Sequence, residues 1–347
     1  MKSRILAAAC AAAIAGPAAA AEFTLVVPLV TGEDNYNFRA VRAFQHHVVA
    51  ESGGRIAVDI FTGGTLCSSG RECFDAMQAG LVHIFQSNFG EPSNLWPSFA
   101  VLDLPYMLRD DPVAECVFDY EPFMADLREG MLEATGNIRL MTVSNSGGWR
   151  NWATTNRPIL TPEDVQGMRI RTIPAEVHQE LVRQLGGAPV GISWPEVYTS
   201  LATGVVEGTM NGITDIVAMN FQDHLNHITL DRHAYMGGTW FINNDMFMSM
   251  PDDLRKIVVE GFDIIEQFLR AYPKFAEVAA YETFVAAGGT IHTLTNEEHA
   301  AFREATSGMR DWAIAQHPDN ERWLNRFEQV VAACEAQIDG RLADLIQ

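Results

Sequence analysis

The most regular pattern of hydrophobic and polar positions lies in the middle of the chain, between Gly167 and Asn211. Apolar residues there first alternate with polar ones and then recur every three or four positions, and the two spacings follow each other in turn. The predicted elements, in order, are a strand at 168–172, a helix at 175–185, a strand at 188–192, a helix opened by a Ser-x-x-Glu capping box at 193–204, and an extended segment at 205–211. This strand–helix–strand–helix–strand order is typical of a parallel α/β domain.

The same order of elements occurs near the start of the chain. The predicted elements there are strands at 23–29, 55–62 and 82–86 and helices at 38–50 and 69–79. Two α/β lobes of similar plan are therefore expected. The later elements are two short strands at 138–143 and 149–155 that cross between the lobes, a strand at 234–242, and a long helix at 251–287 that bends at Pro273.

Three side chains stand near the carboxyl ends of the predicted strands in the middle of the chain. Arg171 ends the first strand, Trp194 lies in the first turn of the second helix, and Asn211 follows the last strand. Ligands of open α/β sheets bind outside the carboxyl ends of the strands, so all three are candidate ligand contacts. Asn88 follows the strand at 82–86 and is a fourth candidate, with a simple turn residue as the alternative.

Two arginines and three tryptophans give the predicted cleft its chemistry. Arg150 and Arg171 each follow a predicted strand, and a guanidinium matches a carboxylate with two parallel hydrogen bonds. Trp149, Trp194 and Trp240 supply flat apolar walls, which suits a small organic acid in a mostly apolar cleft. The alternative for either arginine is a structural ion pair with a nearby acid, and the pattern alone does not separate the two interpretations.

The first 21 residues have the pattern of a secretory signal peptide. Lys2 and Arg4 precede a short apolar stretch, and a run of alanines precedes position 22. A membrane anchor is the alternative, but the apolar stretch is short and Gly16 and Pro17 interrupt it. No other stretch has 18 uninterrupted apolar residues, so the mature chain is expected to be soluble and not membrane-embedded.

The chain is strongly acidic, with a formal net charge of −20 over 347 residues. Removal of the signal peptide takes away two basic residues and no acidic ones, which leaves the mature chain at −22. This charge argues against nucleic acid and anionic membrane surfaces as partners. Any site for an anion must therefore act locally, because surface charge is screened within about 10 Å at ordinary salt.

An even number of cysteines follows the signal peptide. They are Cys67, Cys73, Cys116 and Cys334. In an exported chain this predicts disulfides, with Cys67–Cys73 as the local pair and Cys116 left for Cys334. Zinc binding is the alternative, but the spacing of the first pair is not that of metal ligands and no histidine stands close by.

The sequence contains no motif of an established catalytic type. A Gly-x-Ser-x-Gly elbow, a His-Glu-x-x-His motif, a phosphate-binding loop and an EF-hand pattern are all missing from it. His224 and His227 would face the same way on a helix and could hold a metal, although surface histidines are the favoured interpretation. We therefore expect no metal, no cofactor and no enzyme activity, while an exported enzyme acting on small acids in the same cleft stays open as the alternative.

Several segments resemble one protein family. Leu160–Arg171 is similar to the "DLKGLKIR" signature of DctP-type solute-binding proteins of TRAP transporters, and Glu196–Gly208 is similar to the "EVYxALQTGVVDG" segment of that family. Gly147–Arg150 and Leu104–Tyr106 match it as well. The resemblance covers essentially the whole mature chain. Met210 and Gly212 depart from the usual residues around Asn211, and Trp149 is bulkier than expected, which leaves the identity of the ligand open.

The resemblance implies a fold, a site and a set of partners. It implies a two-lobed α/β periplasmic-binding-protein-like fold, with a long bridging helix and strands that cross between the lobes. Arg171 corresponds to the arginine that binds the substrate carboxylate and Arg150 to a second basic residue of the cleft. Trp194, Asn211 and Asn88 fall at positions that contact the ligand. The implied partners are a small organic acid and the membrane permease subunits of a sodium-driven transporter, or a receptor if the protein senses its ligand.

The expected organisation follows from the pattern and the resemblance together. Residues 1–21 form the signal peptide, 22–145 the first lobe, 146–231 the second lobe, and 251–287 the bridging helix, with parts of 232–347 in both lobes. The mature protein is expected in the periplasm. Oligomeric state is not readable from the sequence, and a monomer is the working expectation.

Overall fold

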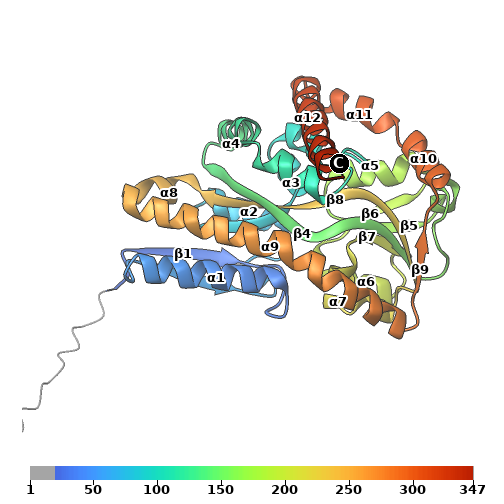
Figure 1. The fold of residues 1–347 in the computed structure, drawn as a ribbon. Coiled ribbons are helices and arrows are strands. Elements are labelled where there is room, and N and C mark those ends of the chain that lie inside the picture. The colour runs from blue at the N-terminus through green and yellow to red at the C-terminus, as the bar shows by residue number, and fades with distance from the viewer. Residues whose placement is uncertain (1–19, 347) are drawn as a thin grey trace, which may run out of the picture.

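A computed structural model describes residues 20–346, so the predicted signal peptide lies almost entirely outside the described residues. The core of the fold is a mixed sheet with strand order β3-β8-β4-β7-β5-β6, in which β9 also pairs with β8 (Figure 1). The strands are β3 (Ile84–Asn88), β4 (Ile138–Thr154), β5 (Arg169–Thr172), β6 (Ala188–Gly191), β7 (Gly208–Asn211), β8 (His227–Asn243) and β9 (Thr290–Thr293). The two-lobed α/β architecture expected from the sequence is confirmed.

A second, two-stranded sheet extends the first lobe. β1 (Phe23–Pro28) and β2 (Ile56–Phe61) pair in parallel. His83, just before β3, joins this sheet to the larger one, because its backbone N–H donates to the Val26 carbonyl at 2.9 Å and its Nδ1 accepts the Val26 N–H at 3.0 Å. The histidine side chain thus takes the place of a ladder hydrogen bond.

β4 and β8 are long antiparallel strands that run through both lobes. The part of β4 before Asn145 pairs with β8 beside β3, whereas the part after Arg150 also pairs with β7. The two short crossing strands expected from the sequence are therefore one strand. The predicted break coincides with a register shift at Gly147 and Gly148, whose φ angles of 108° and 91° bend the strand without ending it.

Helices cover both faces of the sheet (Figure 1). They are α1 (Tyr36–Glu51), α2 (Gly70–Gln78), α3 (Asp111–Asp119), α4 (Glu121–Thr135), α5 (Glu176–Gln184), α6 (Val197–Ala202), α7 (Ile213–Ala218), α8 (Asn244–Ser249), α9 (Asp252–Ala286), α10 (Asn296–Ala305), α11 (Gly308–Gln316) and α12 (Asn320–Ile346). The predicted bridging helix is α9, which continues through Pro273 and contacts α1, β4 and α7, and so lies along both lobes.

The helix starts follow local capping chemistry at some positions and not at others. Ser69 accepts the Glu72 N–H at the start of α2, and Thr295 and Glu298 form a reciprocal capping box at the start of α10. The capping box predicted at Ser193 is not formed, because Trp194–Glu196 makes a 3₁₀ turn that leads into α6. His224 and His227 do not share a helix either, since His227 begins β8.

Three hydrophobic clusters hold the elements together. One lies between the sheet and the helices α1 and α9, where the Phe44 and Phe262 ring centres are 5.3 Å apart. A second packs α6 and α7 against the end of α9 around Phe221 and Phe284. The third and largest spans α3, α4, α5 and α12, and therefore ties the C-terminal helices to both lobes.

Two disulfides are present. Cys67 bonds to Cys73 with their Cα atoms 5.3 Å apart, and Cys116 of α3 bonds to Cys334 of α12 with their Cα atoms 5.8 Å apart. The second bond spans 218 positions of the chain and fastens the last helix to the first lobe. Sequence reasoning proposed both pairs against a zinc alternative, and no group of three or more metal-ligating side chains is found within residues 20–346.

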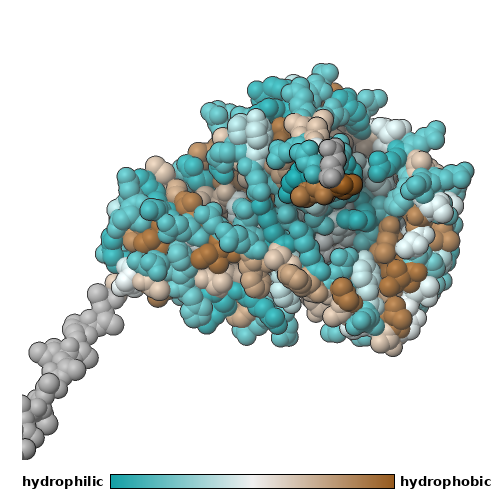
Figure 2. Space-filling view, viewed as in Figure 1, coloured by the Kyte–Doolittle hydropathy of each residue, from teal (hydrophilic) through white to brown (hydrophobic). Residues whose placement is uncertain are grey.

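The face of the molecule seen in Figure 2 is mostly hydrophilic, with smaller apolar patches, some of them over α9. Phe275 and Val278 of α9 are 81% and 65% exposed. None of the helices formed by residues 20–346 has both the length and the apolar run needed to cross a bilayer.

Candidate ligand-binding site

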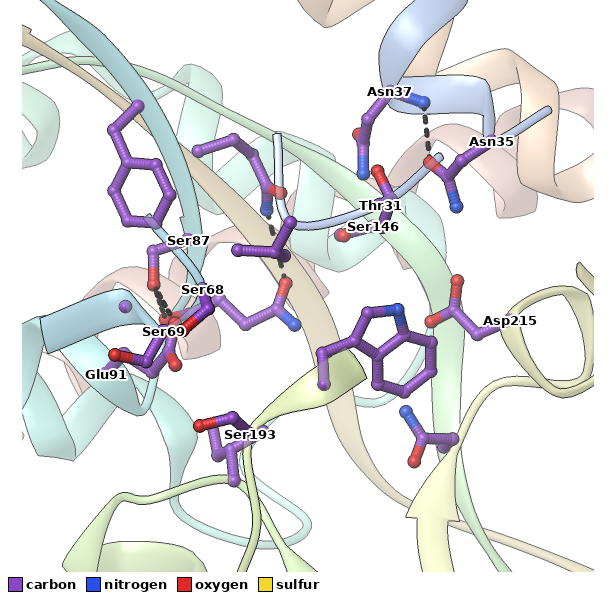
Figure 3. Close-up of a pocket in the computed structure, with 18 of the residues that line it drawn as sticks. Thr31, Asn35, Asn37, Ser68, Ser69, Ser87, Glu91, Ser146, Ser193 and Asp215 are labelled. Carbon is purple, nitrogen blue, oxygen red and sulfur yellow. Dashed lines mark hydrogen bonds between the residues drawn. The ribbon is translucent and has the colours of Figure 1, made fainter. Parts of the chain in front are cut away.

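A cavity opens between the two lobes and contains about 640 Å³, part of it open to solvent. Its walls come from the β1–α1 loop, the start of α2, β3 and η1 (Glu91–Asn94) in the first lobe, and from β5, η4 (Trp194–Glu196), β7 and α7 in the second. Hydroxyl side chains on several walls line it (Figure 3), namely Thr31, Ser68, Ser69, Ser87, Ser146 and Ser193.

Four of the seven residues predicted from the sequence to bind a ligand line this one cavity. They are Asn88, Arg171, Trp194 and Asn211. Arg171 and Asn211 lie near the ends of β5 and β7, which are parallel neighbours, so the sequence pattern explains why these two converge: carboxyl ends of parallel neighbouring strands meet at one edge of a sheet. Asn88 ends β3, which pairs with β8 in the first lobe and reaches the cavity from that lobe. Trp194 joins them because the 3₁₀ turn after β6 carries its ring over the end of β5.

Arg171 is the central charge of the cavity. It is 1% exposed, yet it lines the cavity wall. Its Nε donates to the Ile192 carbonyl at 3.0 Å, which fixes the guanidinium, while its Nη2 has no hydrogen-bond partner among the described residues. The guanidinium carbon lies 5.5 Å from the centre of the Trp194 ring. A buried, oriented and unpaired donor of this kind requires an acceptor.

The electrostatic setting of Arg171 disfavours its charge and so favours an incoming anion. Burial and then repulsion from Arg150 lower the pKa of Arg171 to about 9, and Glu91 and Asp215 offset part of this shift. The side chain still carries its charge at neutral pH. An anion placed against Nη2 relieves both the unmet hydrogen bond and the repulsion.

Arg150 lies behind the cavity wall and not in it. It is 1% exposed, and its Nη1 donates to the Met210 carbonyl at 2.9 Å. Burial lowers its pKa, against the opposing attraction of Asp103, Asp215 and Glu91. Arg150 therefore contributes positive potential through the wall. The direct contact with a ligand carboxylate that the sequence suggested is corrected to this indirect role.

Trp149 and Trp240 do not reach the cavity, which corrects their predicted placement beside the ligand. Successive side chains of a strand face opposite ways, and because Arg150 faces the cavity side of β4, Trp149 faces away from it. Its ring packs 4.7 Å from the Arg232 guanidinium and 5.5 Å from the Tyr235 ring. Trp240 is fully buried in the cluster under α1, and its Nε1 donates to Ser144 Oγ at 3.0 Å.

Asp215 is the main lining residue that the sequence analysis missed. It is 6% exposed, it stands in the first turn of α7, and its Oδ1 accepts the Tyr36 hydroxyl at 2.7 Å. Burial raises the pKa of Asp215 to about 6, and the Tyr36 hydrogen bond and both arginines hold it from rising further. The sequence signal that could have identified Asp215 is its position four residues after Asn211, just beyond the carboxyl end of β7.

Glu91 is a second missed carboxylate. Its side chain accepts the Ser87 hydroxyl at 2.6 Å, and burial raises its pKa while Ser87, the two arginines and the Gly70 N–H lower it. The carboxylate sits over the start of α2, where a Cβ at position 70 would come within 2.4 Å of the Glu91 carboxyl carbon. Gly70 therefore makes room for an internal anion at this helix start.

Most of the polar groups in the lining are hydroxyls and amides. As formed by the described residues, the lining contains no histidine, cysteine or lysine. The Ser87 hydroxyl in it donates to the Glu91 carboxylate. The buried pair of His178 and Asp103 lies outside the lining. An oriented guanidinium, an aromatic ring, hydroxyls and amides together can hold a small polar molecule with one anionic end.

Comparison with known proteins gives one consistent match. The family model described as bacterial extracellular solute-binding protein, family 7, matches residues 29–314. The C4-dicarboxylate-binding periplasmic protein DctP of Rhodobacter capsulatus is 25% identical over 304 residues, covering 86% of this chain and 89% of that protein. A solute-binding protein of Verminephrobacter eiseniae is 28% identical over 233 residues, covering 67% of this chain and 68% of that protein.

Solved structures share the fold. A TRAP periplasmic solute-binding protein of Roseobacter denitrificans with bound β-D-glucuronate superimposes with a TM-score of 0.82 at 25% identity, covering 89% of this chain and 98% of that one. One from Sulfurospirillum deleyianum with bound succinate gives a TM-score of 0.81 at 22% identity, covering 89% and 99% of the two chains.

Proposed function

Because the chain belongs to the bacterial extracellular solute-binding proteins of family 7, we propose that it captures one small organic acid between its lobes and delivers it to a membrane permease. The lobes, 22–145 and 146–231 with parts of 232–347, close over the acid, and α9 bridges them. Arg171 holds the carboxylate of the acid, and Trp194 covers it. Asn88 and Asn211 bind its polar groups, and Arg150 adds positive potential from behind.

One observation carries this proposal. Arg171 lines the cavity between the lobes with a buried guanidinium whose Nη2 has no partner among the described residues, while its Nε is already anchored to the Ile192 carbonyl. Burying an unpaired charged donor is costly, so the residue is built for a partner that arrives from outside. A carboxylate fits the planar fork of a guanidinium. The names of relatives that bind C4-dicarboxylates and glucuronate support this ligand class.

The delivery step follows the family. In this proposal the signal peptide directs the chain to the periplasm, where it acts as a monomer and meets the permease subunits of a TRAP transporter. The permease uses a sodium gradient for uptake, and the binding protein carries out no covalent chemistry. The match to a family described as solute-binding proteins supports a binding protein over the enzyme alternative.

A thermal-shift screen against monocarboxylates, dicarboxylates and sugar acids tests the proposal on wild type and Arg171→Ala in parallel. A ligand at 100 times its dissociation constant stabilises the fold by about 2.7 kcal/mol, which is readily measured. We expect a stabilising acid whose effect is absent from Arg171→Ala. Turnover of that acid by the purified protein, or equal stabilisation of the variant, would contradict the proposal.

A further inference from the structure

The cavity already contains its own negative charges. Asp215 lines the wall formed by the second lobe and Glu91 the wall formed by the first, and Figure 3 shows the two carboxylates on opposite sides of the cavity. Arg171 in the lining and Arg150 behind it supply two positive charges. The four charges cancel before any ligand arrives. A ligand with one carboxylate adds one negative charge to this set, and a dicarboxylate adds two.

The two carboxylates differ in how far the protein satisfies them. The Glu91 carboxylate receives the Ser87 hydroxyl and the Gly70 N–H. Asp215 receives the Tyr36 hydroxyl on Oδ1, and no donor among the described residues reaches its Oδ2. Asp215 is 6% exposed and lines the cavity, so its Oδ2 can accept a hydrogen bond from a molecule bound there.

Arg171 and Asp215 therefore line the same cavity, one with an unpaired hydrogen-bond donor and the other with an unpaired acceptor. The guanidinium Nη2 of Arg171 lacks an acceptor, and Oδ2 of Asp215 lacks a donor. They do not meet each other, since the structure contains no hydrogen bond or ion pair between them. A single molecule that is anionic at one end and a hydrogen-bond donor at the other meets both needs at once.

We propose that the ligand is a monocarboxylate whose far end donates hydrogen bonds to Asp215, from hydroxyl or ammonium groups, and that a dicarboxylate is rejected. This inference rests on the proposed function, because it takes the Arg171–carboxylate contact as given. The hydroxyl and amide groups around Asp215, on Asn35, Asn37 and Ser146, continue the same polar wall (Figure 3). A second carboxylate at this end meets a buried like charge, which lowers affinity at least about tenfold.

Three probes separate the possible far ends, each with one carboxylate for Arg171. D-Glucuronate offers hydroxyls, 4-aminobutanoate offers an ammonium group, and succinate offers a second carboxylate. Isothermal titration calorimetry on the full mature protein measures all three. We expect glucuronate or 4-aminobutanoate to bind at least about tenfold more tightly than succinate. Whichever of these two probes binds more tightly identifies the donor as a hydroxyl or an ammonium group.

Asp215→Asn tests the cause of the selectivity. Asparagine keeps the oxygen that accepts the Tyr36 hydroxyl and removes the charge. We expect the variant to bind the preferred donor probe at least about tenfold more weakly and succinate more tightly than wild type does. Asp223→Asn is the matched control, because Asp223 also accepts a tyrosine hydroxyl, from Tyr198 at 3.0 Å, but on the surface and outside the cavity. It should leave all three affinities unchanged, and melting temperatures verify folding.

The outcomes separate the two proposals. One outcome is that succinate binds wild type most tightly, that Arg171→Ala abolishes its binding, and that Asp215→Asn leaves its affinity unchanged. This outcome overturns the donor-end proposal and leaves the proposed function standing. If no probe binds, the small molecule released on denaturing the protein as isolated is identified by mass spectrometry. A released dicarboxylate overturns the inference alone, a released monocarboxylate with donor groups supports it, and a molecule without a carboxylate overturns both proposals.

Discussion

Arg171 lies with its guanidinium carbon 5.5 Å from the centre of the Trp194 ring, although the two residues belong to different elements, β5 and the turn after β6. The ring shields the guanidinium from water, and the Ile192 carbonyl holds its Nε at 3.0 Å. Neither contact satisfies Nη2, which has no hydrogen-bond partner among the described residues. The arrangement fixes one donor geometry before a ligand binds, which lowers the entropic cost of binding.

Substitution of Arg171 should remove most of the affinity. Loss of one partner of a buried charged pair costs about 2–5 kcal/mol, so Arg171→Ala should weaken binding at least about tenfold. Arg171→Lys should rescue only part of this, because an ammonium lacks the planar fork. Calorimetry with the acid found in the screen measures both.

Arg169→Ala is the matched control for that experiment. Arg169 lies two residues earlier in the same strand, but it is exposed and outside the cavity lining, and it pairs with Glu207 at 3.4 Å. Its loss should leave the affinity within about twofold, since exposed ion pairs contribute little. An equal loss of affinity in both variants would mean that the strand, and not the cavity guanidinium, is what matters.

Removal of the Trp194 ring should weaken binding by a smaller factor. Trp194→Ala takes away the cation–π contact and the apolar cover of the ligand, together worth about 1–2 kcal/mol, or about tenfold in affinity. Trp149→Phe serves as the control, because Trp149 faces the opposite side of β4 and phenylalanine keeps a ring beside Tyr235. Fluorescence titration of both variants is the measurement, and equal losses would refute the placement of Trp194.

The two disulfides should affect different properties. Cys67 and Cys73 are 6 positions apart and enclose Ser68 and Ser69 of the cavity wall, whereas Cys116 and Cys334 are 218 positions apart. Loop-closure entropy gives about 2 kcal/mol of stability for the short ring and about 5 kcal/mol for the long one. Serine variants of the first pair should therefore lose mainly ligand affinity, and variants of the second mainly melting temperature.

Paired measurements of melting temperature and dissociation constant on the two double variants provide the test. The variants serve as controls for each other, since each lacks one covalent bond. If both lose affinity in proportion to their loss of stability, the short ring has no specific role in shaping the cavity wall.

Asp215 should make the stability of the unliganded protein depend on pH. Its pKa is raised from 3.8 to about 6, so the folded chain holds this proton more tightly than the unfolded chain does. The proton therefore stabilises the fold at low pH, and this contribution, of the order of 3 kcal/mol, is lost as the pH rises from about 4 to about 6. Tyr36, Arg150 and Arg171 are the titratable or charged groups that act on this carboxyl.

Urea unfolding at pH 4 and pH 7 measures the effect against Asp215→Asn. The variant has no carboxyl to titrate, so it should gain stability relative to wild type as the pH rises through this window. A difference between the two proteins that stays constant from pH 4 to pH 7 would contradict the raised pKa.

Much of the fold follows from local sequence signals. The alternation at 168–172 is the strand β5, and the serine before α2 caps that helix because the side-chain oxygen and the N–H it accepts are three residues apart. Arg171 and Asn211 could be placed at the site for a similar reason, because strand ends and helix starts are adjacent in the chain. Interactions between near neighbours need no knowledge of the distant chain.

Errors appear where a property depends on residues far apart. Gly147 and Gly148 indicated a break, but pairing with β8 carries β4 through them. Trp240 resembled a cavity wall and is instead enclosed by the packing of α1 and α9 on the sheet. Asp215 is held at the cavity by a hydrogen bond from the hydroxyl of Tyr36, which lies 179 positions away in the chain.

The sequence by itself determined the elements, the two lobes and the arginine that faces their cleft, because periodicity and chain order specify them. Only the tertiary structure decided which side of β4 meets the cavity, that Arg150 acts from behind the wall, and that two carboxylates share the space with Arg171. Burial and charge pairing are properties of the assembled chain. They arise when segments separated by a hundred or more residues exclude water together.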